Sequence, residues 1–308
     1  MSQEGESWSL SLFSLGKGLS TSVFHVCLPL PHECYSRWVF WGVLRRSLLL
    51  QVENLTKVFP NGTVAVKNVS FEVQDGEFLA VIGLSGSGKS TLLRCINRLI
   101  DPTEGRVIWD GRDITIARGA ELRQIRRQIG MVFQQFNLVK RSSVMTNVLS
   151  GRLGYAHPVW SLFHRFPRED RRRAMAALER VGIPEKADDR ADRLSGGQQQ
   201  RVGIARALMQ EPRLMLADEP VASLDPVLSH SIMQYLELLN RQDGITVLCS
   251  LHFLDLVHRY ATRVIGLKDG ELVFDGVPSD LTRARFKEVY GEEAEMVTVG
   301  GAAQVVSE

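Results

Sequence analysis

The stretch FLAVIGLSGSGKST, residues 78–91, joins an apolar run to a glycine-rich loop and then to a helix-forming segment. Within it, GLSGSGKS at 83–90 has the spacing G-x-x-x-x-G-K-[ST]. Glycines in such a loop let successive backbone N–H groups point inward, and the start of the helix adds about half a positive charge. A strand before the loop and a helix after it predict a phosphate-binding cradle. Lys89 would reach the β- and γ-phosphates of a nucleotide, and Ser90 would ligate Mg²⁺.

The segment RLMLADEP, residues 213–220, supplies a second part of a nucleotide-hydrolysing site. Its apolar run ends in Asp218 and Glu219, and α/β proteins bind ligands at the carboxyl ends of their strands. We expect Asp218 to hold Mg²⁺ through water and Glu219 to polarise an attacking water. An isolated Asp-Glu pair is most simply a solvated turn, and the glycine cradle is what favours the catalytic interpretation.

LSGGQQQR, residues 194–201, contains a second pair of glycines, placed after a serine and before a helix-forming run. On its own, Ser-Gly-Gly is as typical of a capped helix start as of a phosphate contact. A second cradle is redundant if it serves the same nucleotide in the same subunit. It has a use if it serves a nucleotide held by another copy of the chain.

Short apolar runs bounded by turns predict strands, several of them apolar enough to be buried on both faces of a parallel sheet. The predicted strands are 48–55, 63–73, 77–83, 106–111, 129–134, 213–218, 245–252 and 263–276. The predicted helices are 90–100, 168–181, 198–209 and 228–240. The last helix should turn Ile232, Tyr235, Leu236 and Leu239 to one side. No strand is evident between 135 and 194, which predicts a mostly helical subdomain inserted into an α/β core.

Composition limits the classes to which this chain of 308 residues can belong. Apolar residues make up 44% and charged residues 23%, as in ordinary globular proteins, and the net charge of +2 gives no general electrostatic case for nucleic-acid binding. The four cysteines form no CxxC pair or zinc-like spacing and are too sparse for a disulfide scaffold. No stretch reaches the roughly 18 apolar residues of a membrane span.

The N-terminal segment is predicted to lie outside the main domain. It begins with acidic residues, its apolar run is interrupted by Lys17, and no small-residue cleavage site follows, so it does not resemble a signal peptide. We expect residues 1–47 to be a poorly ordered extension or a product of the choice of start site. The main domain is expected at 48–292, with the helical subdomain at about 136–211. Residues 293–308 are expected to form a disordered tail.

Together these motifs resemble the ATP-binding subunits of ABC transporters, whose signature motif is LSGGQ. The resemblance runs from about Leu48 to about Gly291. It implies a P-loop NTPase (RecA-like) α/β core with a mostly parallel sheet, an N-terminal antiparallel β-region and the inserted helical subdomain. It also implies a head-to-tail homodimer, in which each chain completes the ATP site of the other. The partner-subunit ATP contacts would be Ser195, Gly196, Gly197, Gln198 and Asp225.

Other motifs occur at the positions that the resemblance requires. The ATP-binding residues that it implies are Phe59, Gly83, Leu84, Ser85, Gly86, Ser87, Gly88, Lys89, Ser90, Thr91 and Gln134. Mg²⁺ would be held by Ser90, Gln134 and Asp218, and the catalytic residues would be Glu219 and His252. Phe59 would stack on adenine; the alternative is that Phe59 is a structural residue of the hydrophobic core. The alternative for His252 is a purely structural histidine after a strand.

The signature motif also occurs in ATPases of chromosome maintenance, repair and translation. These carry long coiled coils or usually two cassettes per chain, and neither feature is present here, nor are basic patches or aromatic platforms for nucleic acid. The favoured interpretation is a peripheral transporter subunit at the cytoplasmic face of the cell (inner) membrane, without nucleic acid. Its partners would be integral-membrane permease subunits and, indirectly, an extracytoplasmic solute-binding protein.

Several segments resemble the phosphonate importers in particular, among them FQQFNLV at 133–139. Phosphate, phosphite and polar amino acids stay open as alternative cargoes. An aromatic insert, YAHPVWSLFHRFP at 155–167, either packs within the helical subdomain or shapes a surface that faces the permease. In the second case the residues concerned would be Trp160, Phe163 or Phe166.

Overall fold

The computed structural model describes residues 47–155 and 166–291. The expected tail at 293–308 and nearly all of the expected N-terminal extension therefore lie outside the described residues. So do Trp160 and Phe163 of the aromatic insert. The domain boundaries inferred from the sequence stay predictions.

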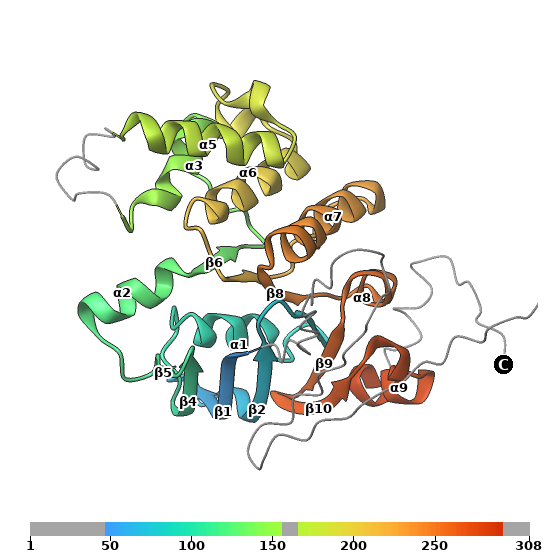
Figure 1. Cartoon of the computed structure of the whole chain (residues 1–308). Helices are drawn as coiled ribbons and strands as arrows, with labels where there is room; N and C mark the ends of the chain where they lie inside the picture. The colour runs from blue at the N-terminus through green and yellow to red at the C-terminus, as the bar shows by residue number, and fades with distance from the viewer. Residues whose placement is uncertain (1–46, 156–165, 292–308) are drawn as a thin grey trace, which may run out of the picture. The chain divides into compact units, whose positions relative to one another are not determined.

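The main sheet has six strands in the order β10-β9-β3-β8-β7-β6 (Figure 1). Neighbouring strands pair in parallel, except for β9 and β10, which form an antiparallel hairpin at one edge. The strands are β3 (Phe78–Ile82), β6 (Ile129–Val132), β7 (Leu214–Ala217), β8 (Thr246–Ser250), β9 (Arg263–Lys268) and β10 (Glu271–Gly276). Every residue of β3, β6, β7 and β8 is buried, which explains why their sequences are nearly continuous apolar runs.

A second, antiparallel sheet has the order β2-β1-β4-β5. Its strands are β1 (Leu48–Val58), β2 (Val64–Gln74), β4 (Glu104–Trp109) and β5 (Arg112–Asp113). Buried and exposed residues alternate along much of β2, as expected when one face of a sheet covers a core and the other meets water. The predicted antiparallel region near the N-terminus is confirmed.

Two groups of helices accompany the sheets. Those of the α/β core are α1 (Lys89–Ile96), α2 (Gly119–Arg127), α7 (Pro226–Asp243), α8 (Leu254–Tyr260) and α9 (Arg283–Tyr290). The others lie between β6 and β7 in the chain and pack on one another (Figure 1); they are α3 (Val144–Leu149), α5 (Arg168–Arg180) and α6 (Gly196–Leu208). Single 3-10 turns occur at Ser150–Arg152, Pro184–Lys186, Ala191–Arg193 and Pro278–Asp280. The α/β class with a helical insert is therefore confirmed.

The main sheet separates two hydrophobic cores. Phe78, Ala80 and Ile82 of β3 belong to a core shared with α7 and the inserted helices. Leu79 and Val81 belong to a second core, shared with α1 and the antiparallel sheet. Because side chains alternate along a strand, β3 contributes to both cores, and its two faces are both covered. Phe166 of the aromatic insert packs against the first core, in agreement with the core-packing alternative for that residue.

The structure differs from the sequence prediction at several helices: α3 and α8 lie outside the predicted helix ranges, and so does α2, while α1 is shorter than predicted. The helix expected over 90–100 ends at Ile96. Arg98 has a left-handed backbone with φ of 49°, and a right-handed helix cannot continue through such a residue. Helix α2 was not predicted, because Ile125 is its only buried residue and one apolar position makes no recognisable period.

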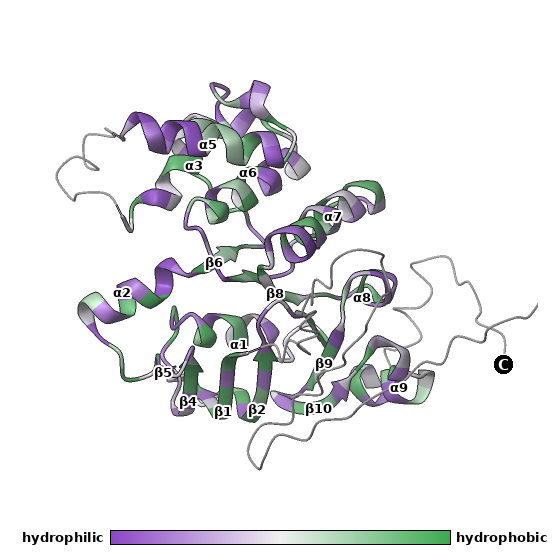
Figure 2. Ribbon diagram, viewed as in Figure 1, coloured by the Kyte–Doolittle hydropathy of each residue, from purple (hydrophilic) through white to green (hydrophobic). Residues whose placement is uncertain are grey.

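The long helices bury one stripe of side chains each. Helix α5 is mostly hydrophilic, purple in Figure 2, and Leu178 is among its few buried residues. In α7, Ile232, Leu236 and Leu239 are buried as predicted, and Tyr235 is half-buried. Within residues 47–155 and 166–291, no helix has the length and apolar content that crossing a membrane requires.

Two leucines of α7 offer a matched test of this core. Leu236 is 0% exposed and Leu238 is 44% exposed. We expect Leu236→Ala to lower the free energy of unfolding by about 2–5 kcal/mol, because it removes buried methyl groups and leaves a cavity. Leu238→Ala should change it by about 0.5 kcal/mol or less. Urea unfolding followed by circular dichroism measures both, and equal losses would contradict the assigned burial.

Candidate functional site

The loop between β3 and α1 lies against the backbone of two other segments. Gly88, directly before α1, has φ of 101°, and a Cβ added there would lie 2.1 Å from the carbonyl oxygen of Ala65. A Cβ added at Gly83 would lie 2.2 Å from the carbonyl oxygen of Leu267. These contacts are too short for any side chain, so the close approach requires glycine at both positions. The predicted cradle is therefore a tightly held backbone fold.

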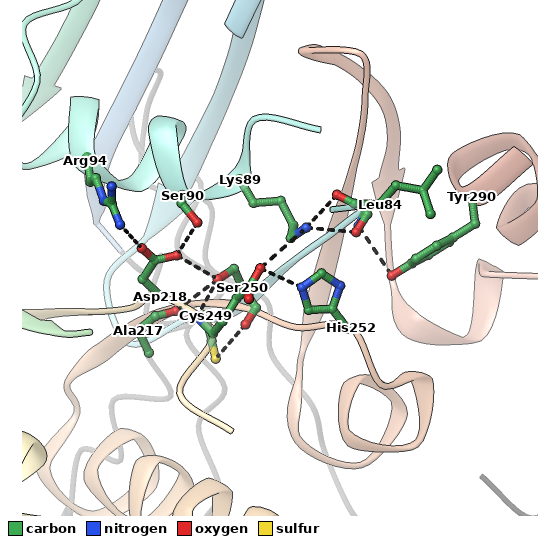
Figure 3. A network of polar contacts seen from close by, with 12 residues as sticks. Leu84, Lys89, Ser90, Arg94, Ala217, Asp218, Cys249, Ser250, His252 and Tyr290 are labelled. Atoms are coloured by element: carbon green, nitrogen blue, oxygen red, sulfur yellow. Dashed lines mark hydrogen bonds and ion pairs between the residues drawn. The ribbon is translucent and has the colours of Figure 1, made fainter. Parts of the chain in front are cut away.

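Lys89 begins α1 and folds back over the loop (Figure 3). Its Nζ donates hydrogen bonds to the carbonyl oxygens of Gly83 at 2.9 Å and Leu84 at 2.8 Å, and it lies 3.8 Å from Glu219 Oε1. Lys89 is 3% exposed, and this burial lowers the pKa of its ammonium group, against the opposing effects of Glu219 and Asp218. A buried amino group is thus held beside the glycine loop.

Asp218 follows β7, and its carboxylate is buried, with 1% of the residue's surface exposed. Ser90 Oγ donates to its Oδ1 at 2.7 Å, Arg94 Nη2 donates to its Oδ2 at 3.2 Å, and Ser250 Oγ donates to Oδ1 at 3.4 Å (Figure 3). Two of these partners come from α1 and one from the end of β8. The carboxylate therefore joins the cradle helix to two strands of the main sheet.

Glu219 has a left-handed backbone, with φ of 47°, which is uncommon for a residue other than glycine. Its N–H donates to Ser250 Oγ at 2.8 Å, and its Oε1 lies 2.6 Å from Nε2 of His252. The hydrogen bond with His252 lowers the pKa of Glu219, burial opposes it, and Lys89 adds to the lowering. The carboxylate is therefore ionised at neutral pH, as a general base must be.

The structure brings five predicted residues into one network. They are Lys89, Ser90, Asp218, Glu219 and His252. Arg94 and Ser250 complete the network and were not predicted. Arg94 follows Ser90 by four positions on α1, and Ser250 precedes His252 by two at a strand end. Both spacings place side chains on the same side of an element, which is a weak signal that could have indicated them.

Tyr290, on α9, supports the loop from a distant part of the chain. Its hydroxyl accepts the N–H of Gly83 at 3.4 Å, and its side chain is 1% exposed (Figure 3). Burial raises the pKa of Tyr290 to about 12, so the hydroxyl is neutral. Phe286 packs on it, with the ring centroids 4.2 Å apart. The two hydrogen-bonded residues are 207 positions apart, and no local pattern could have indicated this contact.

The donor atoms beside the cradle suit Mg²⁺. Ser90 Oγ and Asp218 Oδ1 are hard oxygen atoms 2.7 Å apart, the type of ligand that this cation takes. In the part of the chain that the structure describes, no three or more His, Cys, Asp or Glu side chains gather as a metal cluster. Mg²⁺ is usually bound by one or two protein groups together with phosphate oxygens, and the residues present fit that pattern.

Gln134 lies at the edge of this network. It is exposed and lines a cavity of about 210 Å³ together with Arg94, which is bonded to Asp218. Among the described residues, no hydrogen bond links Gln134 to Ser90 or Asp218. The structure therefore places Gln134 beside Arg94, a partner of Asp218, without joining it to the other two predicted metal ligands.

Phe59 lies in the turn that follows β1, where its N–H donates to the carbonyl oxygen of Thr63 at 2.9 Å. The ring is half-buried, and Lys57 Nζ lies 5.5 Å from its centroid. Phe59 belongs to neither of the two hydrophobic cores of the described chain. Its geometry therefore argues against the alternative of a core aromatic.

The residues predicted to serve a second copy lie at two helix starts. Ser195 caps α6: its Oγ accepts the N–H of Gln198 at 3.3 Å, and Gln198 Oε1 accepts the N–H of Ser195 at 3.0 Å. Asp225 caps α7 by accepting the N–H of Leu228 at 2.9 Å. A Cβ at Gly197 would lie 3.1 Å from Leu228, so the two helix starts pack together. In the described chain, no hydrogen bond or ion pair joins them to the glycine cradle.

This geometry defines a class of protein. A strand, a glycine cradle and a helix are combined with an aspartate and a glutamate–histidine pair at the carboxyl ends of neighbouring parallel strands. That arrangement is typical of a P-loop nucleoside triphosphatase.

Comparisons with known proteins identify the family. The family description "ABC transporter" matches residues 66–222. The chain is 55% identical over 243 residues to "Phosphonates import ATP-binding protein PhnC" of Staphylococcus aureus (strain USA300), covering 79% of this chain and 94% of that protein. The protein of the same name from Staphylococcus haemolyticus (strain JCSC1435) is 54% identical over 245 residues, with 79% and 95% covered. The chain belongs to the ABC transporter family, as an ATP-binding protein.

Solved structures of ATP-binding cassettes agree with this assignment. The dimeric cassette MJ0796 bound to ADP and Pi matches with a TM-score of 0.67 and 38% identity, covering 75% of this chain and 99% of that one. The cassette MJ1267 in its ADP conformation matches with a TM-score of 0.67 and 32% identity, covering 83% and 100%.

Two glycines of the cradle differ in their surroundings and test its tightness. Gly86 has φ of 81°, but no atom lies within 4 Å of an added Cβ, whereas Gly88 meets the Ala65 carbonyl. We expect Gly88→Ala to lower the free energy of unfolding by about 2 kcal/mol more than Gly86→Ala, because it adds a backbone clash to the strain that both share. Denaturant unfolding without nucleotide isolates this effect from ATP binding. Equal losses would show that the Ala65 contact is loose.

Proposed function

We propose that this chain is the ATP-hydrolysing subunit of an importer that drives phosphonate uptake through separate permease subunits. The observation that carries the hydrolytic part is the convergence of Lys89 and His252 on the carboxylate of Glu219, at 3.8 Å and 2.6 Å. The identity of 55% to proteins described as phosphonate import ATP-binding proteins supports the cargo.

The glycine cradle binds the phosphates of ATP, and Phe59 stacks on the adenine. The remaining ATP-binding residues are Gly83, Leu84, Ser85, Gly86, Ser87, Gly88, Lys89, Ser90, Thr91 and Gln134. Lys89 exchanges the carbonyl oxygens of Gly83 and Leu84 for phosphate oxygens, which carry more negative charge. The buried hydroxyl of Ser87 has no hydrogen-bond partner within the described chain and is available to the same ligand. Backbone N–H groups at the start of α1 complete the site.

Hydrolysis depends on charge and position around the γ-phosphate. Ser90, Gln134 and Asp218 would hold Mg²⁺, and the cation would supply positive charge at the phosphates. Glu219 accepts a hydrogen bond from the attacking water and orients it, since its carboxylate is ionised and carries no proton of its own. His252 fixes the rotamer of Glu219 and contacts the γ-phosphate. The rate enhancement then comes from positioning and charge neutralisation.

A homodimer completes the two sites. Each chain supplies the γ-phosphate contacts for the ATP held by the other, through Ser195, Gly196, Gly197, Gln198 and Asp225. In the described chain these residues form no hydrogen bond or ion pair with the cradle, which supports this arrangement, as does the similarity to a dimeric cassette bound to ADP and Pi. The dimer binds integral-membrane permease subunits at the cytoplasmic face of the cell (inner) membrane. An extracytoplasmic solute-binding protein delivers the cargo, and nucleic acid takes no part.

Variants of Glu219 and Lys89 distinguish the hydrolytic role of the first from the ATP-binding role of the second. We expect Glu219→Gln to keep ATP affinity and lose at least about 100-fold in kcat, because the amide cannot act as a base. The variant should accumulate as an ATP-bound dimer in size-exclusion chromatography. Lys89→Ala should instead lose ATP affinity, because the cradle then lacks its positive charge. Wild-type turnover by Glu219→Gln would refute the base assignment.

The cargo is tested in lipid vesicles that contain this chain with its neighbouring permease. ATP hydrolysis is measured after adding the binding protein with an alkylphosphonate, phosphate, phosphite or a polar amino acid, and Glu219→Gln serves as the blank. We expect the strongest stimulation with the alkylphosphonate. Stimulation by another solute keeps the importer and replaces the cargo. Intrinsic ATPase activity without any permease assembly would favour a soluble ABC ATPase instead.

A further inference from the structure

The segment Gln134–Val139, which lies between β6 and α3, is bound by a side chain of α6. Arg206 Nη1 donates to the carbonyl oxygen of Asn137 at 2.6 Å, and Arg206 Nη2 donates to that of Phe136 at 2.9 Å. In the described chain, Arg206 forms no ion pair with a carboxylate. Both terminal nitrogens of its guanidinium group therefore donate to two consecutive backbone carbonyls.

The two carbonyls belong to an unusual stretch of backbone. Phe136 has φ of 59° and Asn137 has φ of 49°, so two successive residues without glycine are left-handed. Two such residues in succession are unfavourable for a chain without glycine, and the conformation persists only where neighbouring groups hold it. The two hydrogen bonds from Arg206 hold this conformation, because its planar guanidinium group fits two fixed acceptors.

A second side chain holds the end of the same segment. Asn147, on α3, is 2% exposed. Its Oδ1 accepts the N–H of Val139 at 2.7 Å, and its Nδ2 donates to the carbonyl oxygen of Val139 at 3.2 Å. The backbone from Phe136 to Val139 is thus tied to α3 and α6 at three positions.

The residue just before this segment packs on the opposite face of the main sheet from α6. Phe133 packs against the core shared with α1 and the antiparallel sheet. Gln134 and Gln135 are exposed, and both line the cavity that contains Arg94, the partner of Asp218. Phe133 is therefore attached to the core shared with α1, whereas Phe136 is attached to α6, and Gln134 and Gln135 lie between these two attachments.

Helix α6 carries Arg206 in its last turn and is capped by Ser195 at its first. Its 13 residues span roughly 20 Å. The helix that presents the contacts for the ATP of a second copy therefore also grips the segment that follows Gln134.

We propose that Arg206 is a positioning residue that ties the segment Phe136–Val139 to α6, so that movement of α6 displaces the chain at Gln134 and couples ATP binding at the dimer interface to the permease. The coupling role rests on the proposed function, whereas the tie itself does not. In the described chain, Arg206 hydrogen-bonds to none of the residues assigned to ATP binding, and it acts through Phe136 and Asn137.

The test compares Arg206→Met with Arg201→Met, which removes another arginine of α6. Arg201 donates to Ser231 Oγ at 3.1 Å and lies 5.1 Å from the Tyr235 ring, away from the segment. Hydrogen–deuterium exchange of the folded full chain reports the tie directly. We expect amides in 136–139 to exchange at least about tenfold faster in Arg206→Met, because the loop opens more often, and at the wild-type rate in Arg201→Met.

The same variants are assembled with the permease in vesicles, and ATP hydrolysis is measured with and without binding protein and alkylphosphonate. We expect Arg206→Met to keep intrinsic ATPase activity within about twofold and to lose stimulation by cargo about five- to tenfold, while Arg201→Met keeps both. Arg206→Lys keeps the charge but supplies a single donor group, so it should restore only part of the stimulation.

The outcomes separate the two proposals. Faster exchange at 136–139 in Arg206→Met, together with a wild-type chain that no cargo stimulates, supports the tie and overturns the proposed importer. Unchanged exchange in both Arg206 variants overturns the tie. Faster exchange with full stimulation by cargo overturns the coupling role. If Arg206→Met does not fold, as judged by circular dichroism, Arg206→Lys decides by the same readouts.

Discussion

The burial of one charged group, the carboxylate of Asp218, constrains the whole site. A carboxylate with 1% of its surface exposed is stable only when donors surround it. Those donors come from Ser90 and Arg94 on α1 and from Ser250 on β8, so satisfying the charge aligns the cradle helix with the carboxyl ends of β7 and β8. Removing any partner would leave part of the buried charge uncompensated.

The contact between Glu219 and His252 follows from this alignment. Glu219 is the next residue after Asp218, and His252 lies two residues after Ser250, so the two side chains emerge from adjacent strands. Their 2.6 Å contact and the buried ammonium of Lys89 keep the glutamate ionised. The left-handed backbone at Glu219 is the strained point of the strand end, and the hydrogen bond from its N–H to Ser250 helps to hold it.

A second constraint acts between the sheet and the inserted helices. Only two connections, after β6 and before β7, join the inserted helices to the main sheet along the chain. The first connection begins at Phe133, which packs against the core shared with α1. A few residues later, its backbone is hydrogen-bonded to Arg206 of α6 and Asn147 of α3. A helix that holds one end of a short segment would link the proposed dimer contact at Ser195 to the surface near Gln134.

The elements that local sequence patterns could predict are those whose physical cause is local. Buried parallel strands need continuous apolar runs, and a phosphate cradle needs glycines and a lysine at fixed spacing, so β3, β7, β8 and Lys89 were predictable. Helix α2 and the early end of α1 were not, because one buried isoleucine and a left-handed arginine leave no periodic pattern.

Contacts between distant segments required the folded chain. Arg94 reaches Asp218 across 124 positions, Tyr290 reaches Gly83 across 207, and Arg206 reaches Phe136 across 70. Spacing along a chain cannot encode such pairs, because each depends on where two independent elements pack. Residue types and strand ends therefore specified the chemistry of phosphate binding and hydrolysis, and only packing in three dimensions selected the side chains that hold those groups in place.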